Sequence, residues 1–401
     1  MWERAPATSL PRKNTPTQII VTDRVMNPNA ESEPLPGLYA LWITELLGGA
    51  IPRESRATCH ACAMCAQEGE ESPSASYFFD PVVRCCSYVP DLHNFLVGRI
   101  LSDTDPAAQQ GRASVHKRIA DAVGVTPIGL KQPPVYALLY KRSSEAFGRS
   151  RTLRCPHYVE DGNLCGIWRN RESTCATWFC KHVRGHVGYT FWRDSLHPLL
   201  QAVETDLARW CVLELQLGEE ALRHSVASAD WTSEAEAITS DALENRADQK
   251  TYARLWGKWR GREHEFYCRC GALVSPLGWA DVLTICGPST RAYARLTQEA
   301  YGRLISADIP SNLSVGRFVV LKIQRTMTRV NTYNDFDPLD IPNAVMELLQ
   351  YFDGRPVVDA LAAIADERGV SLDAALVRKM VDFKLLVPPE MLVSTRESSP
   401  I

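Results

Sequence analysis

The chain has 401 residues, of which 45% are hydrophobic and 23% are charged, a balance typical of a globular protein with two or three domains. The formal net charge of −3 offers no overall attraction to phosphate backbones or anionic lipid. No apolar run is long enough to predict a spanning helix, and the start of the chain lacks the apolar segment of a secretory signal. We therefore expect a cytoplasmic protein that binds neither nucleic acid nor membrane.

The first two thirds of the chain combine short helices with loops. Residues 1–35 are rich in proline, asparagine, threonine and serine and predict a disordered arm. Apolar residues at helical spacing predict helices in GLYALWITELLGGAIP, LHNFLVGRILSD and SVHKRIADAVG, the last of which ends near Gly124. Pro133-Pro134 predicts the beginning of a loop. Charge pairs and apolar periodicity then predict a helical region over residues 201–315.

The last part of the chain, residues 316–401, has a different pattern. RFVVLKIQRTMTRVNTY is β-branched and loosely alternating, which predicts a strand or hairpin. Three helices are expected in IPNAVMELLQYFDG, PVVDALAAIADERG and SLDAALVRKMVDF, with breaks at Gly354 and Gly369 and an N-cap at Ser371. Their apolar faces predict a small core that contains Val345, Leu348, Leu349, Leu361, Ile364, Leu376, Met380 and Phe383.

The cysteines are concentrated in one part of the sequence. Nine of the thirteen lie between Cys59 and Cys180, and in a reducing compartment such a group predicts metal or redox chemistry rather than disulfides. TCHACAMCAQEG has a CxxCxxC spacing in a small, polar segment, and the adjacent pair in VVRCCSYVP suits two metals, or two irons of one cluster. Catalytic thiol chemistry without a metal is the alternative. The predicted ligands are Cys59, Cys62, Cys65, Cys85, Cys86, Cys155, Cys165, Cys175 and Cys180.

Histidines near these cysteines are secondary candidates. His182 and His186 are four residues apart, so on a helix they would share one face and could join a site with Cys180, or form a polar helix edge. His60 lies inside the first cysteine loop, where three thiolates would outcompete it. His157 is expected to be a second-shell or surface residue.

The cysteines after residue 200 carry a weaker signal. Cys211 and Cys286 stand in apolar runs and are expected to be small buried side chains. Cys268 and Cys270 form a CxC pair close to His264, but three donors are too few for a closed site, which would need another ligand from elsewhere.

The segment CPHYVEDGNLCGIWRNRESTCATWFC resembles the second half of the YkgJ-type cysteine-cluster (CxxCxxCC) family. The matching residues, in order, are Cys155-Pro156, Gly162, Cys165, Ile167-Trp168, Arg171 and Cys175. The chain departs from the family in the nineteen residues, 66–84, that separate Cys65 from Cys85-Cys86, and in Glu172, which stands near a family proline. The resemblance covers residues 55–185 and implies a cysteine-ligated metal centre that holds an iron–sulfur cluster, of the 4Fe-4S type, or zinc.

The C-terminal segment AVMELLQYFDGRPVVDALAAIADERGVSLDAALVRKMVDFKLL resembles PqqD-like domains, which are small winged-helix modules. The resemblance implies a peptide bound by β-augmentation at an exposed strand edge. SLDAALVRKMVDF carries two basic and two acidic residues and offers no basic face for DNA. A helical packing module without a ligand is the alternative.

The expected fold class is mainly α with small β elements. Its parts are an arm (1–35), a loop-rich cysteine-cluster metal domain (36–200), a helical region (201–315) and a winged-helix module (316–401). The leading functional hypothesis is a metal protein, with iron–sulfur favoured over zinc, that acts on or docks a peptide or protein substrate in a modification or biosynthetic pathway. One alternative is a zinc-stapled, non-catalytic interaction protein.

A second alternative comes from more distant relatives of the cysteine-cluster family, the flagellin lysine N-methylases. It would make the chain a protein methyltransferase, although no G-x-G-x-G loop follows a predicted strand. No Ser-His-Asp set, paired carboxylates or phosphate loop stands out. The sequence therefore predicts neither the reaction nor the oligomeric state.

Overall fold

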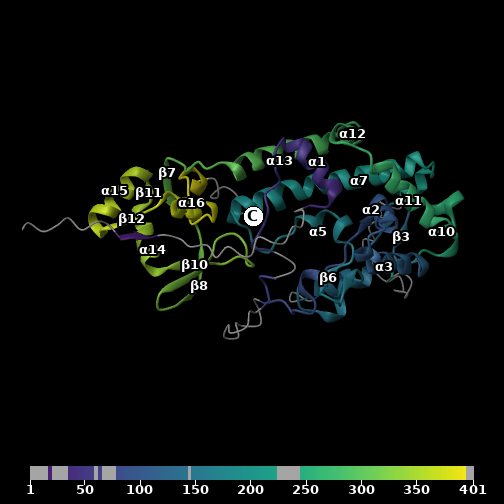
Figure 1. Cartoon of the computed structure of the whole chain (residues 1–401), viewed down its shortest axis with the longest axis horizontal. Helices are drawn as coiled ribbons and strands as arrows, with labels where there is room; N and C mark the ends of the chain where they lie inside the picture. Colours follow the sequence, from purple (N-terminus) through teal and green to yellow (C-terminus); the bar gives the residue numbers. More distant parts are fainter. Residues whose placement is uncertain are drawn as a thin grey trace, which may run out of the picture. The chain divides into compact units, whose positions relative to one another are not determined.

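The computed structural model describes residues 17–19, 35–57, 62–65, 78–142, 146–223 and 244–393, without the side chains of 17–19 and of a few residues at helix ends. These residues are mainly helical, with small sheets of two or three strands, as the sequence predicts. They form two compact units (Figure 1): a central unit within Met26–Val183 and Gly188–Ile305, and a C-terminal unit within Met1–Val25, Arg184–Val187 and Ser306–Ile401. Across these described ranges, no helix is both long enough and apolar enough to cross a membrane.

The central unit is built from helices joined by short loops. Its α-helices are α1 (Gly37–Leu47), α2 (Asn94–Ser102), α3 (Gln109–Ala120), α4 (Pro134–Arg142), α5 (Ser173–Thr177), α7 (His197–Glu214), α8 (Glu219–Arg223), α10 (Gln249–Trp256), α11 (Glu263–Val274), α12 (Trp279–Ile285) and α13 (Pro288–Ile305). Between them lie the 3₁₀ turns η1 (Arg84–Ser87), η2 (Pro106–Ala108), η3 (Arg151–Leu153), η4 (Trp168–Asn170) and η6 (Gly257–Trp259) and the π-helical segment η5 (Thr190–Leu196). The strands are β2 (Leu92–His93), β3 (Val125–Thr126), β4 (Gly129–Leu130), β5 (Tyr158–Val159) and β6 (Leu164–Cys165).

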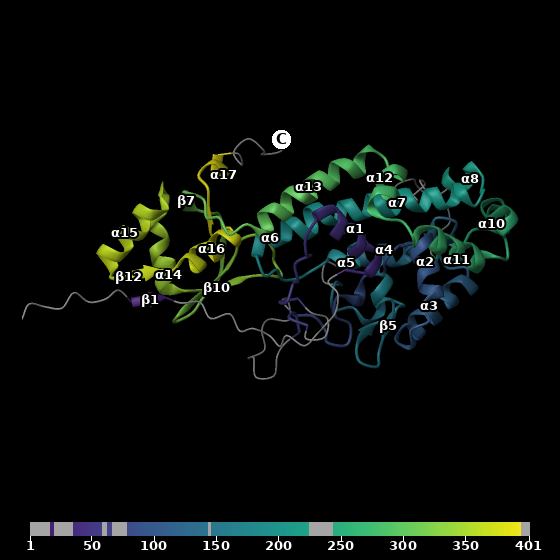
Figure 2. The same ribbon diagram turned by 45° about the horizontal axis from the view of Figure 1, so that its top comes forward.

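The long helices α7 and α13 lie side by side, and α1 packs against α12 and α13 (Figures 1 and 2). Aromatic side chains fill the spaces between the helices, because each removes a large apolar area from water. Those with the least exposure are Tyr39, Trp42, Phe95, Phe191, Trp192, Trp256, Phe266 and Tyr267. These packed helices form the frame on which the cysteine-bearing loops are held.

Helices α2 and α11 approach each other unusually closely at two glycines. A Cβ atom added to Gly98 would lie 1.8 Å from the carbonyl oxygen of Tyr267, and one added to Gly271 would lie 3.0 Å from the backbone nitrogen of Arg99. Only glycine permits backbones to pack at this distance. The contact fixes α2, and with it His93, which directly precedes that helix.

The C-terminal unit combines a strand-rich beginning with several short helices. Its strands are β1 (Thr17–Ile19), β7 (Asn312–Val315), β8 (Val319–Ile323), β9 (Met327–Asn331), β10 (Leu339–Pro342), β11 (Asp353–Pro356), β12 (Val370–Leu372) and β13 (Leu386–Val387). Its helices are α14 (Asn343–Leu348), η7 (Leu349–Tyr351), α15 (Val357–Arg368), α16 (Ala374–Asp382) and α17 (Glu390–Val393), and α6 (Gly185–Tyr189) begins in this unit. The antiparallel sheets have the orders β10-β9-β8 and β11-β7-β13, and β1 pairs in parallel with β12.

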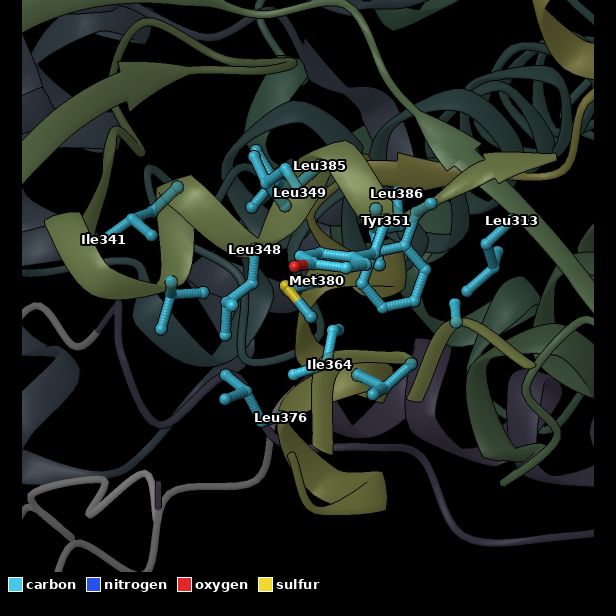
Figure 3. Close-up of a cluster of buried hydrophobic side chains, with 14 of the residues drawn as sticks. Leu313, Ile341, Leu348, Leu349, Tyr351, Ile364, Leu376, Met380, Leu385 and Leu386 are labelled. Carbon is cyan, nitrogen blue, oxygen red and sulfur yellow. The ribbon is translucent and has the colours of Figure 1, made fainter. Parts of the chain in front are cut away.

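One apolar cluster holds the helices of the C-terminal unit against its strands (Figure 3). Its buried residues are Leu313, Val330, Ile341, Val345, Leu348, Leu349, Tyr351, Phe352, Ala360, Ile364, Leu376, Val377, Met380, Leu385 and Leu386. Most of the core residues expected from sequence are members. Leu361 is partly buried against the cluster, and Phe383 is buried with its ring 6.1 Å from that of Tyr333.

Several local predictions can be compared with the structure. The helices expected in residues 37–52, 92–103 and 356–369 are confirmed, and Gly369 ends α15 in the left-handed conformation at φ 62°. The N-cap expected at Ser371 is wrong: Ser371 lies in β12, and Asp373 caps α16 by accepting a hydrogen bond from the Leu376 amide at 2.6 Å. Pro134 begins α4 instead of a loop, which fits the preference of proline for the first helical turn.

The expected arm, residues 1–35, lies almost entirely outside the described residues. Within it, the structure describes Leu35, which is buried, and the three-residue strand β1. Thr17, Gln18 and Ile19 pair with Val370, Ser371 and Leu372. Among the described residues of the expected arm, the short strand β1 and the buried Leu35 therefore depart from disorder.

Candidate metal centre and adjoining pocket

Two cysteine-bearing segments meet in the central unit. Cys85 and Cys86 lie in η1, and the carbonyl oxygen of Cys86 accepts a hydrogen bond from the backbone N–H of Cys155 at 2.6 Å. Arg84, in the same turn, donates from Nη1 to the carbonyl oxygen of Asn163 in the turn between β5 and β6. These bonds join the early and late halves of the cysteine pattern although about seventy residues separate Cys86 from Cys155.

Cys165 is positioned by a hairpin that packs on α3. It ends β6, where it pairs with Tyr158, and the turn passes through Gly162 and Asn163 with φ of 79° and 54°. The hairpin packs so closely on α3 that a Cβ at Gly111 would lie 2.0 Å from the carbonyl oxygen of Gly166. The glycine in this part of the predicted family motif, Gly162, therefore serves the turn that carries Cys165.

Cys175 is held through its own backbone by two charged side chains. Glu172 caps α5, where its carboxylate accepts from the N–H groups of Thr174 at 2.6 Å and Cys175 at 2.8 Å. Arg171 donates from Nε to the carbonyl oxygen of Cys175 at 3.1 Å, and its guanidinium stacks on the Trp168 ring at 3.6 Å. The carboxylate of Glu172 therefore contributes the N-terminal cap of α5.

The thiols of Cys155, Cys165 and Cys175 share one electrostatic neighbourhood. Burial raises the pKa of Cys155 to about 12, and the neighbouring thiol of Cys165 adds to the shift. Burial also raises the pKa of Cys175, as do Glu172, Cys165 and Cys155. Each residue keeps some exposed surface, but the sulfurs are crowded enough that a negative charge on one disfavours a charge on the others.

Cys62 and Cys65 form a separate thiol pair. Their side chains share a hydrogen bond, which lowers the pKa of Cys62 to about 6 and raises that of Cys65, and the Arg84 guanidinium assists the ionised form of Cys62. The pair therefore loses its first proton more easily than an ordinary thiol and its second with more difficulty. Cys59 and His60 lie outside the described residues, so the first CxxC of the motif has no structural account.

The segment from Cys180 to His186 differs from the prediction of a shared helix face. Cys180 and His182 lie in the non-helical connection after α5, and His186 alone is helical, in α6. His182 is buried with its ring 5.6 Å from that of Tyr189, whereas the His186 ring contacts that of Tyr333 at 5.8 Å. The i,i+4 arrangement that the spacing suggested is therefore wrong.

His157, expected as a second-shell or surface residue, is buried. Its Nδ1 lies 2.7 Å from the hydroxyl of Ser114, and burial together with Arg118 lowers the pKa of His157 to about 3. The imidazole is therefore neutral at physiological pH. It lies on the hairpin that positions Cys165, since its carbonyl oxygen accepts from the Gly166 amide.

The later cysteines behave as the apolar pattern predicts. Cys211 and Cys286 are buried, and the sulfur of Cys211 lies 3.8 Å from the carbonyl oxygen of Cys270. Cys270 is also buried in α11, whereas Cys268 is partly exposed with its sulfur 3.8 Å from Nδ1 of His264. Residues two apart on a helix point to different sides, so the CxC pair does not converge on one ion.

A pocket of about 580 Å³ in the central unit, which the sequence did not predict, adjoins the cysteine region. Its walls come from β2 and the residues before it, the two residues after β4, the start of α5, one side of α7 and the start of α13. Glu172 is shared by the pocket and the cysteine region: it lines the pocket, and its carboxylate accepts a hydrogen bond from the backbone N–H of Cys175.

Glu204 of α7 is the most deeply buried carboxyl group of this pocket, with 1% of its surface exposed. The hydroxyl of Tyr39 donates to it, as do the N–H and hydroxyl of Ser173 at 2.7 and 2.6 Å. Burial raises the pKa of Glu204 to about 8, and the nearby charge of Glu172 adds to the shift. Nδ1 of His93 lies 3.7 Å from its carboxylate, and burial lowers the pKa of His93 to about 4.

Within the part of the chain that the structure describes, no three or more His, Cys, Asp and Glu side chains are arranged so that they could hold a metal ion. The structure therefore brings Cys86, Cys155, Cys165 and Cys175 into one region without closing a coordination shell. Comparisons of the chain with protein-family models, with curated proteins and with solved structures give no match.

Proposed function

We propose that this chain is a cysteine-ligated metal protein that acts on, or docks, a peptide or protein substrate. The observation that carries the proposal is the grouping of Cys155, Cys165 and Cys175 beside the turn that bears Cys85 and Cys86, with the Cys165 thiol near enough to raise the pKa of Cys155 and of Cys175. Inert buried thiols need no such grouping, and soft thiolates are the preferred ligands of zinc and of iron–sulfur clusters.

The backbone around these residues supports a site that is positioned before any metal binds. Cys175 is fixed on its amide side by Glu172 and on its carbonyl side by Arg171, and Cys165 lies at the end of a hairpin that packs on α3. Ligands that are already ordered lower the entropic cost of binding. An iron–sulfur cluster bound here would supply one-electron transfer, whereas zinc would supply folding energy.

The number of candidate ligands favours iron–sulfur over zinc. Nine clustered cysteines exceed the four that one tetrahedral zinc uses. Protein purified without oxygen is therefore expected to be brown, to contain iron and acid-labile sulfide, and to show sulfur-to-iron charge-transfer absorption in the visible range. A colourless protein that contains stoichiometric zinc and no iron would contradict the iron–sulfur assignment, and a metal-free protein would contradict the metal centre itself.

The substrate part of the proposal is supported by strand β8 of the C-terminal unit. In the described sheet β8 is an edge strand, with β9 on one side only, and its residues are exposed although four of the five are apolar. The exposed fractions reach 63% at Val319 and 74% at Ile323. An exposed apolar edge can pair with an added strand through backbone hydrogen bonds, as the resemblance to PqqD-like domains implies.

Peptide docking at β8 can be tested with the full chain and short peptides encoded beside its gene. Replacing Ile323 by glutamate is expected to weaken peptide binding at least about tenfold, because a charge then flanks the added strand. Val358→Glu is the matched control, since Val358 is equally exposed, at 72%, but lies on α15. Binding should change little with salt, because backbone hydrogen bonds carry it.

Three results would contradict the docking role. They are an absence of binding to any of these peptides, equal effects of the two glutamate substitutions, and tight binding to duplex DNA that falls steeply with salt.

A further inference from the structure

The pocket beside the cysteine region contains two buried carboxyl groups without a cationic partner. Glu204 is 1% exposed and Glu172 4% exposed, and neither contacts a lysine or arginine of the described residues. The basic side chain recorded beside Glu204 is His93, at 3.7 Å, and the low pKa of its imidazole keeps it neutral. Carboxyl groups at such depth are normally paired, because removing a charge from water is costly.

The remaining charges of the pocket do not supply the missing partner. Lys131 is engaged by Asp91, with Nζ and Oδ2 3.1 Å apart. Asp206 accepts from the Gly287 amide at 3.1 Å and faces Arg209 at 3.8 Å. The pocket thus has an excess of carboxyl groups over cations, and the excess lies at its buried end.

The size and lining of the pocket identify the kind of cation. A volume of about 580 Å³ is many times that of one water molecule, about 30 Å³, and lies in the range of sites for small organic ligands. The described residues hold no metal-ion geometry here. Tyr88 and Tyr293 offer aromatic rings, while Val89, Pro198 and Ala202 offer apolar surface. Rings and apolar surface suit a cationic head on an aliphatic chain.

We propose that this pocket binds an organic cation, an ammonium or guanidinium group on an aliphatic chain, with the carboxyl group of Glu204 as its counter-ion. In this binding mode the head of the cation lies in the space lined by Glu204, Glu172 and His93. The site is built entirely from residues of the central unit and does not depend on the proposed metal centre. The cation is either a free amine or guanidine or the side chain of a peptide.

Binding of a cation has a proton signature. The titratable groups around Glu204 are Tyr39 from α1, His93 from β2 and Glu172 before α5. The pocket is also lined by Asp91, Lys131 and Asp206. The charge of Arg99, from α2, lowers the pKa of Tyr39. With a pKa of about 8, Glu204 is mostly protonated at pH 7. A bound cation favours the ionised form, so binding at pH 7 releases a proton, and affinity rises as the pH rises through about 8.

The probe is agmatine, which carries a guanidinium and an ammonium group on a four-carbon chain, titrated calorimetrically into the full-length protein. We expect one-to-one binding, with an observed heat that changes between buffers of different ionisation enthalpy because a proton is released. Butylurea and butyrate, which have similar chains with neutral and negative heads, are expected not to bind. A short arginine-containing peptide tested in parallel distinguishes a free cation from a side chain, and binding of either supports the proposal.

Two variants and one control make the assignment specific. Glu204→Gln removes the charge with little change in shape and is expected to weaken binding by about 30-fold. Ala202→Phe adds a ring to the pocket wall formed by α7 while it leaves both carboxyl groups in the chain, and it is expected to abolish binding, which keeps the test valid if Glu204→Gln fails to fold. Glu214→Gln makes the same chemical change on the exposed end of α7, outside the pocket, and is expected to bind like the parent.

The proposal is overturned by any of three results. They are an absence of binding by both agmatine and the arginine peptide at millimolar concentration, equal binding of the neutral or anionic analogue, and binding that survives both Glu204→Gln and Ala202→Phe.

Discussion

Replacing Gly98 by alanine is expected to destabilise the central unit by about 3 kcal/mol or more, although the change adds a single methyl group. The new Cβ would lie 1.8 Å from the carbonyl oxygen of Tyr267 and 2.6 Å from its carbonyl carbon, and both are backbone atoms of α11 that cannot rotate away. The two helices would have to separate, which would disrupt the packing of Phe95, Phe266 and Tyr267 between them. Urea unfolding monitored by tryptophan fluorescence measures the loss.

Gly302→Ala provides the matched control for this prediction. Gly302 lies in α13, is exposed, and has no atom within 4 Å of an added Cβ. Because alanine is a better helix former than glycine, this substitution is expected to be neutral or to stabilise the protein by about 0.5–1 kcal/mol. Equal unfolding midpoints for the two alanine variants would show that α2 and α11 do not cross at Gly98.

The contrast between these two glycines shows what the sequence could and could not predict. Apolar periodicity correctly predicted α2 as a helix, because that signal is local. The close approach of Gly98 to α11 involves residues about 170 positions later, and nothing in the local pattern separates Gly98 from Gly302. The same limit explains the wrong N-cap at Ser371, where pairing of β12 with β1, some 350 residues earlier, extends the strand until Asp373 begins α16.

For the candidate site, too, some features are visible in the sequence and others are not. Metal-ligand spacing is visible in the sequence, so the cysteine pattern could suggest candidate ligands, and their binding of a metal stays a prediction. The pocket was missed because its main groups, His93, Glu172 and Glu204, come from three elements and carry no common spacing. A glutamate within the apolar stripe of α7, HPLLQAVETDLARW, was the available signal, since a buried carboxylate rarely occurs without a partner.

Glu172 connects the two findings. Its carboxylate holds the backbone N–H of Cys175 and also lines the cavity that contains Glu204. A carboxylate at residue 172 therefore lets one side chain both fix the position of Cys175 and contribute to the charge of the pocket.

The largest effect on metal content is expected from alanine substitutions within the group of Cys155, Cys165 and Cys175. Cys165→Ala and Cys175→Ala should each reduce bound metal to a small fraction of the parent value, because each removes a proposed ligand whose backbone is held in place by its surroundings. Metal binding stabilises the folded state by about 10–16 kcal/mol in small zinc sites, so losing it should also cost several kcal/mol of unfolding free energy. Metal analysis of anaerobically purified protein, followed by thermal unfolding, measures both effects.

Cys211→Ala and Cys286→Ala separate ligand loss from general loss of packing. Both residues are buried among apolar side chains, so truncation is expected to cost about 1–2 kcal/mol through lost contacts while the metal content stays at the parent value. A chelator should then lower the unfolding temperature of the parent and of these two variants, but should have little effect on Cys165→Ala and Cys175→Ala, which have no metal to lose. If all four variants retained a full metal load, the hairpin and α5 would not carry the ligands, and the centre would have to be sought around Cys62 and Cys65 instead.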